Sequence, residues 1–230
     1  MIEFPRGLIV SSQALAGNPL RDSELLAVMA EAAASGGASA IRANGVDDIS
    51  AIRKRVKIPI IGIDKRKDDT GRTVITPNFE GAKAIAEAGA DIIALDVTEY
   101  PSSIREDSRT LIRRIHEELD VPVMADISTA REARLAAEMG ADAVSTTLAG
   151  YIPGALHTDC ELYTPNFTLI EEIVSMHLSC LLVAEGRIWE RADLAKIFAL
   201  GADAVVIGKA VTNPMAITRY FKSVVPEEKR

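Results

Sequence analysis

Cysteine and histidine, the residues that build most disulfides and metal sites, are scarce in this chain. The two cysteines, Cys160 and Cys180, are too few for a disulfide framework, which favours a reducing compartment. His157 lies near Asp159 and Cys160, but the spacing matches no common zinc pattern, and the other two histidines lie in stretches with a helical pattern. We therefore expect no metal ion.

Positive charge and long apolar runs are also lacking. The 33 acidic residues exceed the 26 basic ones, and the net charge of -7 is opposite to the basic footprint of a general nucleic-acid-binding protein. No apolar run reaches the roughly 18 residues that a membrane helix needs. The start, MIEFPR, lacks the charged-then-apolar layout of a signal peptide. These absences predict a cytoplasmic protein that binds neither nucleic acid nor membrane.

What the chain does contain is a series of short apolar runs that alternate with longer amphipathic stretches. The eight runs cover residues 7–13, 38–42, 59–65, 91–96, 121–126, 141–147, 181–186 and 202–208. Near-continuous apolar strands are typical of parallel sheets covered on both faces. The amphipathic stretches predict helices, one with Ser23 as N-cap and another with a capping box from Thr129 to Glu132.

A Gly-Ala-Asp motif recurs at 89–91, 140–142 and 201–203, with a weaker copy at 36–39. Each glycine is expected to end a helix in the left-handed conformation, directly before a strand. Repeated helix–strand units of this kind imply parallel strands with right-handed crossovers. Eight such strands without a Gly-rich dinucleotide fingerprint favour a closed barrel, which typically needs about 250 residues in one domain. We predict that residues 1–230 form a single-domain α/β protein, a (β/α)8 TIM barrel.

Polar residues at the carboxyl ends of barrel strands are the first candidates for catalysis and substrate binding. They are Gln13, Arg42, Lys65, Asp96, Asp126, Thr146, Thr147, Glu185 and Lys209.

Lys65 shares a strand face with Ile61 and Ile63, because side chains alternate along a strand. If those isoleucines point into the barrel, Lys65 emerges at the floor of the pocket. Partial desolvation there would lower its pKa and suit it to act as a base. Alternatively, Lys65 belongs to a solvated cluster with Arg66 and Lys67.

Glu185 ends an apolar strand, where a carboxylate is costly unless it is paired or used. It is either a functional group or the partner of a barrel lysine or arginine. Asp126 presents the same choice, with capping of the following helix as a further alternative.

Gly186-Arg187 and Gly208-Lys209 follow the seventh and eighth strands, where (β/α)8 barrels frequently bind phosphate. Glycine lets the backbone approach a phosphate closely, so we expect a phosphate site at these four residues. The long segment 149–165 after the sixth strand is expected to be functional because of its length.

Several of these pieces together resemble the N-acetylmannosamine-6-phosphate 2-epimerase family. The matching stretches occur in family order over nearly the whole chain: residues 7–13, 40–42, 59–66, 75–77, 88–96, 125–129, 146–151 and 184–187. The resemblance implies interconversion of N-acetylmannosamine 6-phosphate and N-acetylglucosamine 6-phosphate, a step in sialic-acid breakdown. It also implies a homodimer and no metal or redox cofactor.

The resemblance implies that Lys65 and Glu185 are the catalytic pair. Gln13, Arg42 and Asp126 match sugar-contacting positions, and we expect contacts from Thr146 and Thr147 in the matching sixth-strand motif as well. Lys65 would take the C2 proton, and Glu185 would assist ring opening or return a proton. Arg42 and Gln13 would hold the developing enolate and the acetamido oxygen.

This chain departs from the family pattern in three places, the last of them the stretch 208–214. Ser12 replaces a frequent cysteine, and Asp64 occupies a usually apolar position, where a slip of one residue in the strand would turn it inward. Asn213 replaces the arginine of the usual Gly-Ser-Ala-Ile-Thr-Arg-Pro motif, which leaves Lys209 as an alternative place for the basic group.

Two other functions fit the same residues. In an aldolase-type barrel, Lys65 would be a Schiff-base nucleophile. A phosphosugar-binding sensor would bind ligand without turnover, although binding alone needs neither a base nor an acid in the pocket.

Overall fold

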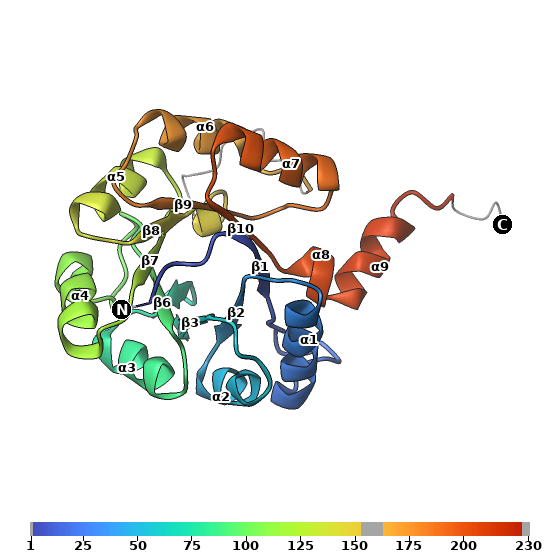
Figure 1. Ribbon diagram of the computed structural model, residues 1–230, viewed down its shortest axis with the longest axis horizontal. Helices are drawn as coiled ribbons and strands as arrows, with labels where there is room; N and C mark the ends of the chain where they lie inside the picture. Colours follow the sequence, from blue (N-terminus) through green and yellow to red (C-terminus); the bar gives the residue numbers. More distant parts are fainter. Residues whose placement is uncertain (1, 153–162, 227–230) are drawn as a thin grey trace.

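The computed structural model describes residues 2–152 and 163–226, and eight parallel strands in it close into a barrel (Figure 1). Around the barrel the order is β1-β10-β9-β8-β7-β6-β3-β2. Each strand overlaps one of the eight apolar runs, so the predicted (β/α)8 barrel is confirmed. The strands are β1 (Gly7–Ser11), β2 (Ala40–Asn44), β3 (Ile60–Ile63), β6 (Ile92–Asp96), β7 (Val123–Asp126), β8 (Ala143–Ser145), β9 (Leu181–Glu185) and β10 (Ala204–Ile207).

Helices surround the barrel, except that α9 extends away from it (Figure 1). They are α1 (Ser23–Ser35), α2 (Val46–Arg55), α3 (Phe79–Glu87), α4 (Ser108–Arg114) with the π-helical turn η1 (Ile115–Leu119), α5 (Ala130–Glu138), the 3-10 turn η2 (Thr146–Leu148), α6 (Phe167–Ser175), α7 (Arg191–Leu200), α8 (Lys209–Thr212) and α9 (Pro214–Lys222). In the ranges that the structure describes, none of them combines the length and hydrophobicity that crossing a membrane demands.

Two helix starts test the capping predictions. The capping box of α5 is confirmed, since Thr129 accepts from the backbone N–H of Glu132 and the Glu132 side chain accepts from that of Thr129. The prediction for α1 is wrong by one residue. Asp22 is its N-cap, and the hydroxyl of Ser23 donates instead to Asp48.

Alternating side chains along the strands divide the core into two layers. Residues inside the barrel are Ile9, Ala40, Ile61, Ile63, Ile92, Ala94, Met124, Ala143, Val183, Ala204 and Val206. Gly62 faces the helices, where an added Cβ would lie 2.5 Å from Cβ of Ala90. Asp64 also faces outward and pairs with Arg66. The predicted strand register is therefore confirmed, and Asp64 does not enter the barrel.

The Gly-Ala-Asp motifs join neighbouring strands at the amino-terminal end of the barrel. Gly89, Gly140 and Gly201 have φ of 112°, 93° and 113°, as expected for helix ends. Each aspartate then accepts from a backbone N–H of the preceding barrel strand: Asp91 from Ile60 (2.8 Å), Asp142 from Val123 (2.7 Å) and Asp203 from Leu182 (2.9 Å). Each also contacts a basic side chain: Arg53, His116 and Arg6, respectively. The motif therefore has a structural role.

A two-stranded hairpin that the sequence did not predict follows β3. It pairs β4 (Lys65–Lys67) antiparallel with β5 (Thr73–Ile75). Asp68 shapes its turn by accepting from the backbone N–H groups of Thr70 and Arg72. Lys65 therefore begins a hairpin above the barrel and does not end a barrel strand.

Candidate active site

A cavity of about 1660 Å³ opens at the carboxyl ends of the barrel strands. Nine of the eleven residues expected at the site line it: Gln13, Arg42, Lys65, Thr147, Glu185, Gly186, Arg187, Gly208 and Lys209. They come from six separate segments of the chain, and the barrel brings them together. The two that do not line it are Asp126 and Thr146.

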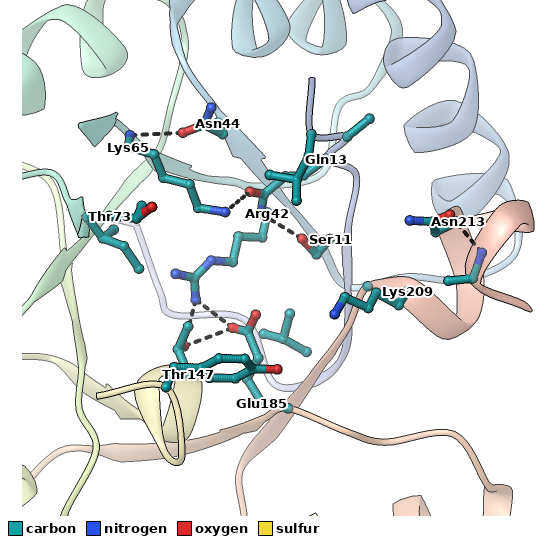
Figure 2. Close-up of a pocket in the computed structure, with 18 of the residues that line it drawn as sticks. Ser11, Gln13, Arg42, Asn44, Lys65, Thr73, Thr147, Glu185, Lys209 and Asn213 are labelled. Atoms are coloured by element: carbon teal, nitrogen blue, oxygen red, sulfur yellow. Dashed lines mark hydrogen bonds and ion pairs between the residues drawn. The ribbon is translucent and has the colours of Figure 1, made fainter. Parts of the chain in front are cut away.

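The amine of Lys65 points into this cavity, although the residue as a whole is exposed. Its Nζ donates to Oε1 of Gln13 over 2.7 Å (Figure 2). Burial of the amine lowers its pKa, as do the charges of Arg42 and Lys209, while Glu185 and Asp126 oppose this. The solvated-cluster alternative does not describe this amine, because it lies in the cavity and donates to Gln13.

Glu185 lies on the opposite side of Arg42 from Lys65 (Figure 2). Its Oε2 accepts from Nη1 of Arg42 at 2.6 Å and lies 2.9 Å from the hydroxyl oxygen of Thr147. Burial raises the pKa of this carboxyl, and the nearby Arg42 opposes the rise. Glu185 is ion-paired with Arg42, as the structural alternative predicted, and it also lines the cavity, where a functional group would lie.

Arg42 is the charged centre of the site. Its side chain is only 1% exposed, and Nη1 donates to Asp126 and Thr147, each at 3.0 Å, while Nη2 donates to Asp126. Burial alone would lower the pKa of the guanidinium, but Asp126 and Glu185 raise it above its ordinary value. Arg42 is therefore a fixed positive charge between an amine and a carboxyl whose pKa values move in opposite directions.

Asp126 and Thr146 hold other site residues in place. Asp126 is fully buried, where it binds Arg42 and accepts from Thr147 at 2.6 Å. It does not cap α5, whose N-cap is Thr129. The hydroxyl of Thr146 accepts from the backbone N–H of Glu185 and donates to the carbonyl of Glu185. Both residues therefore position groups that line the cavity.

Comparison with known proteins shows which family this chain belongs to. Residues 26–227 match the model of the family described as "Putative N-acetylmannosamine-6-phosphate epimerase". The chain belongs to this epimerase family. A relative from Caldanaerobacter subterraneus subsp. tengcongensis, described as "Putative N-acetylmannosamine-6-phosphate 2-epimerase", is 43% identical over 228 residues, 99% of this chain and 94% of the relative. One from Thermosynechococcus vestitus with the same description is 46% identical over 207 residues, 90% of this chain and 88% of that one.

Solved structures agree with the family assignment. The N-acetylmannosamine-6-phosphate 2-epimerase from Clostridium perfringens superposes with a TM-score of 0.89 at 39% identity, covering 95% of this chain and 93% of that one. A thiamine phosphate pyrophosphorylase from Pyrococcus furiosus, with a TM-score of 0.61 at 14% identity over 96% of this chain and 97% of that one, shares the fold alone.

In this member of the epimerase family, the residues expected to bind phosphate differ in what they contact. The guanidinium of Arg187 donates to the backbone carbonyls of Thr164 (3.0 Å) and Ala149 (3.1 Å), so it braces two loop segments. Lys209 is exposed at the start of α8, directly after Gly208. Arg219 of α9 lines the same cavity and was not predicted, because its place depends on the direction in which α9 leaves the barrel.

The other polar residues at the strand ends of this epimerase-family barrel include one that does not line the cavity and two that line it without having been predicted. Asp96 ends β6 but is bound by Arg72 and Arg105 away from the cavity lining. Ser11 and Asn44 line the cavity and were not predicted. Within residues 2–152 and 163–226, no group of three or more His, Cys, Asp or Glu side chains is placed to hold a metal ion. The cluster of His157, Asp159 and Cys160 lies outside the described residues.

Proposed function

We propose that this chain is an N-acylglucosamine-6-phosphate 2-epimerase, which interconverts N-acetylmannosamine 6-phosphate and N-acetylglucosamine 6-phosphate by removing and returning the proton on C2. One observation carries the proposal: the Lys65 amine and the Glu185 carboxyl line one cavity on either side of Arg42. The family membership and the named activity of the Clostridium perfringens relative support it.

The pKa shifts suit these two groups to proton transfer. Lys65, whose pKa is lowered, is the base that takes the proton from C2 of the open-chain aldehyde. The raised pKa of Glu185 makes its carboxyl easier to protonate, which suits it to assist ring opening or to return a proton to carbon. C2 loses one proton and regains one, so the reaction involves no net oxidation.

Arg42 is placed to stabilise the negative charge that develops during this transfer. Two carboxylates and a threonine hold its guanidinium, so it does not need to reorganise when the enolate forms. A donor preorganised in this way is typically worth about 3–4 kcal/mol. Gln13, which contacts Lys65, would bind the acetamido oxygen or the enolate beside Arg42.

The phosphate is expected at the β9 and β10 ends of the cavity. Lys209 supplies a positive charge there, and Gly186 and Gly208 let backbone N–H groups come close. Arg187 would act mainly through its backbone, because its guanidinium binds loop carbonyls. Binding the remote phosphate fixes the sugar and so lowers the barrier at C2.

The protruding α9 supports a homodimer as the working form. This helix has no buried residue, and Phe221 near its end (64% exposed) and Val224 (81%) and Val225 (58%) just beyond it are exposed. Exposed apolar clusters of this kind mark protein interaction sites. A second copy of the chain is the partner that would cover it.

The test is conversion of N-acetylmannosamine 6-phosphate, followed by NMR, by the wild-type protein and by Lys65→Ala and Glu185→Gln. We expect N-acetylglucosamine 6-phosphate from the wild type and a loss of about 10²–10⁴-fold in each variant, the usual contribution of a general acid or base. Ligand binding without conversion would favour the sensor, and trapping of a lysine adduct with borohydride would favour the aldolase.

A further inference from the structure

Ser11, the last residue of β1, is linked to Lys65 through the side chain of Gln13. It is 6% exposed and lines the cavity. Nε2 of Gln13 donates to Oγ of Ser11 over 2.7 Å, and Nζ of Lys65 donates to Oε1 of Gln13 over 2.7 Å. Figure 2 shows the three side chains in a row, from the lysine amine through the amide to the serine hydroxyl.

The direction of the amide decides whether Lys65 works as a base. A carboxamide has an accepting end and a donating end. With the carbonyl toward Lys65, one N–H of the neutral amine is bound and its lone pair stays free for the substrate. With the NH2 group toward Lys65, the amide would donate to that lone pair and withdraw it from the reaction.

We propose that Ser11 is a positioning residue for proton transfer, whose hydroxyl oxygen holds the Gln13 amide with its carbonyl turned toward Lys65. This inference rests on the proposed function, because it assigns the base role to Lys65. It adds a residue that touches neither the reacting carbon nor the base.

The surroundings make Ser11 a rigid support. Its carbonyl accepts from the hydroxyl of Thr212 at 2.7 Å, and it pairs in register with Arg42 of β2. A Cβ added to Gly208 would lie only 3.3 Å from Cβ of Ser11, so this side of the strand is closely packed. Gln13, in contrast, lies beyond the end of β1 and depends on its side-chain contacts for its orientation.

Charged groups surround Lys65, and Gln13 is its neutral hydrogen-bond acceptor. The charges that act on the amine come from Arg42, Glu185, Asp126 and Lys209, while Lys67 and Arg72 of its own hairpin line the same cavity. An acceptor favours the protonated amine. If the amide turns away, the pKa of Lys65 falls further, because the charges remain and the acceptor is lost.

Ser11→Ala removes the support, and Ser12→Ala is its matched control. Ser12 is the adjacent serine on the opposite strand face, fully buried, with its hydroxyl donating to the carbonyl of Leu26 in α1. We expect Ser11→Ala to lower kcat for C2 proton exchange roughly tenfold, with KM within about twofold, in line with one lost hydrogen bond to a polar group. Its pH–rate profile should rise at lower pH than that of the wild type. Ser12→Ala should lower the stability of the protein and leave the pH–rate profile unchanged.

A titration of Lys65 itself provides a readout that does not need turnover. The ¹³Cε shift of Lys65, assigned with the Lys65→Ala variant, is followed against pH in the unliganded wild type, Ser11→Ala, Gln13→Ala and the double variant. We expect a lower pKa in Ser11→Ala and no further change when Ser11→Ala is added to Gln13→Ala, because Ser11 acts through the amide.

An unchanged Lys65 titration in Ser11→Ala, or an equal shift in Ser12→Ala, would overturn the inference. If the wild type fails to exchange the C2 proton, the proposed function is wrong. The Lys65 titration alone then decides whether Ser11 fixes the orientation of the Gln13 amide.

Discussion

At the scale of single residues, the site is organised by Arg42, which is held between the carboxylates of Asp126 and Glu185. Asp126 and Arg42 are both essentially inaccessible to water. A buried charge that loses a partner is strongly destabilising, because the desolvation cost remains while the attraction is gone. The same residues that shape the chemistry therefore also contribute to the stability of the fold.

Asp126→Asn tests this dual role. We expect it to reduce the free energy of unfolding by about 3 kcal/mol, near the lower end of the range for broken buried pairs, because Glu185 still contacts Arg42. Urea denaturation measures the change. Glu117→Gln, which removes the exposed pair with Arg113, is the control and should change stability by less than about 0.5 kcal/mol. Equal effects of the two substitutions would contradict the account.

At the scale of elements, the three Gly-Ala-Asp motifs connect each helix end to the strand before it in the chain. Asp91→Ala removes the acceptor of the Ile60 N–H and the partner of Arg53. We expect a loss of about 1–3 kcal/mol in the free energy of unfolding, the usual range for a half-buried donor left unpaired. Asp47→Ala, at an exposed position of α2, should unfold at nearly the same urea concentration as the wild type. If Asp91→Ala unfolded at the same urea concentration as the wild type, the motif would not contribute to the stability of the fold.

The strands could be predicted from the sequence because their apolar runs are nearly continuous and bounded by the glycine motifs. The hairpin β4–β5 could not, because Lys65, Arg66 and Lys67 carry no apolar alternation and the turn depends on Asp68. The start of α1 was missed by one residue, because Asp22 and Ser23 are both good N-caps and the sequence pattern does not distinguish them.

The site was predictable to the extent that it follows strand alternation. Lys65 and Glu185 could be identified because each shares a face with inward-pointing apolar residues. The positioning role of Asp126 and the contact from Ser11 to Gln13 could not, because both depend on which side chains meet across the barrel mouth. Arg219 needed the path of α9, which no local pattern determines.

At the scale of the whole molecule, the barrel separates stability from chemistry. The aspartates of the glycine motifs close its amino-terminal end, while the cavity and its charges lie at the carboxyl end, as is usual for this fold. The protruding α9 contributes to the cavity through Arg219, while the apolar end of the helix is exposed. The proposed dimer would cover this helix.

Sedimentation of Phe221→Glu tests that assembly. We expect the wild type to sediment as a dimer and the variant to shift toward the monomer, because a charge on the apolar end of α9 disfavours its burial. Val46→Glu, at another exposed apolar position on α2, should remain dimeric. A wild-type monomer, or a Phe221→Glu variant that stays fully dimeric, would count against α9 as the contact.

The central claim is that the Lys65 amine removes the proton from C2. NMR of N-acetylmannosamine 6-phosphate incubated in deuterated water with the wild type and with Lys65→Ala tests it most directly. The account predicts that the wild type forms N-acetylglucosamine 6-phosphate with deuterium at C2, and that Lys65→Ala binds the sugar without exchange. Product without deuterium at C2, or full exchange in Lys65→Ala, would contradict it.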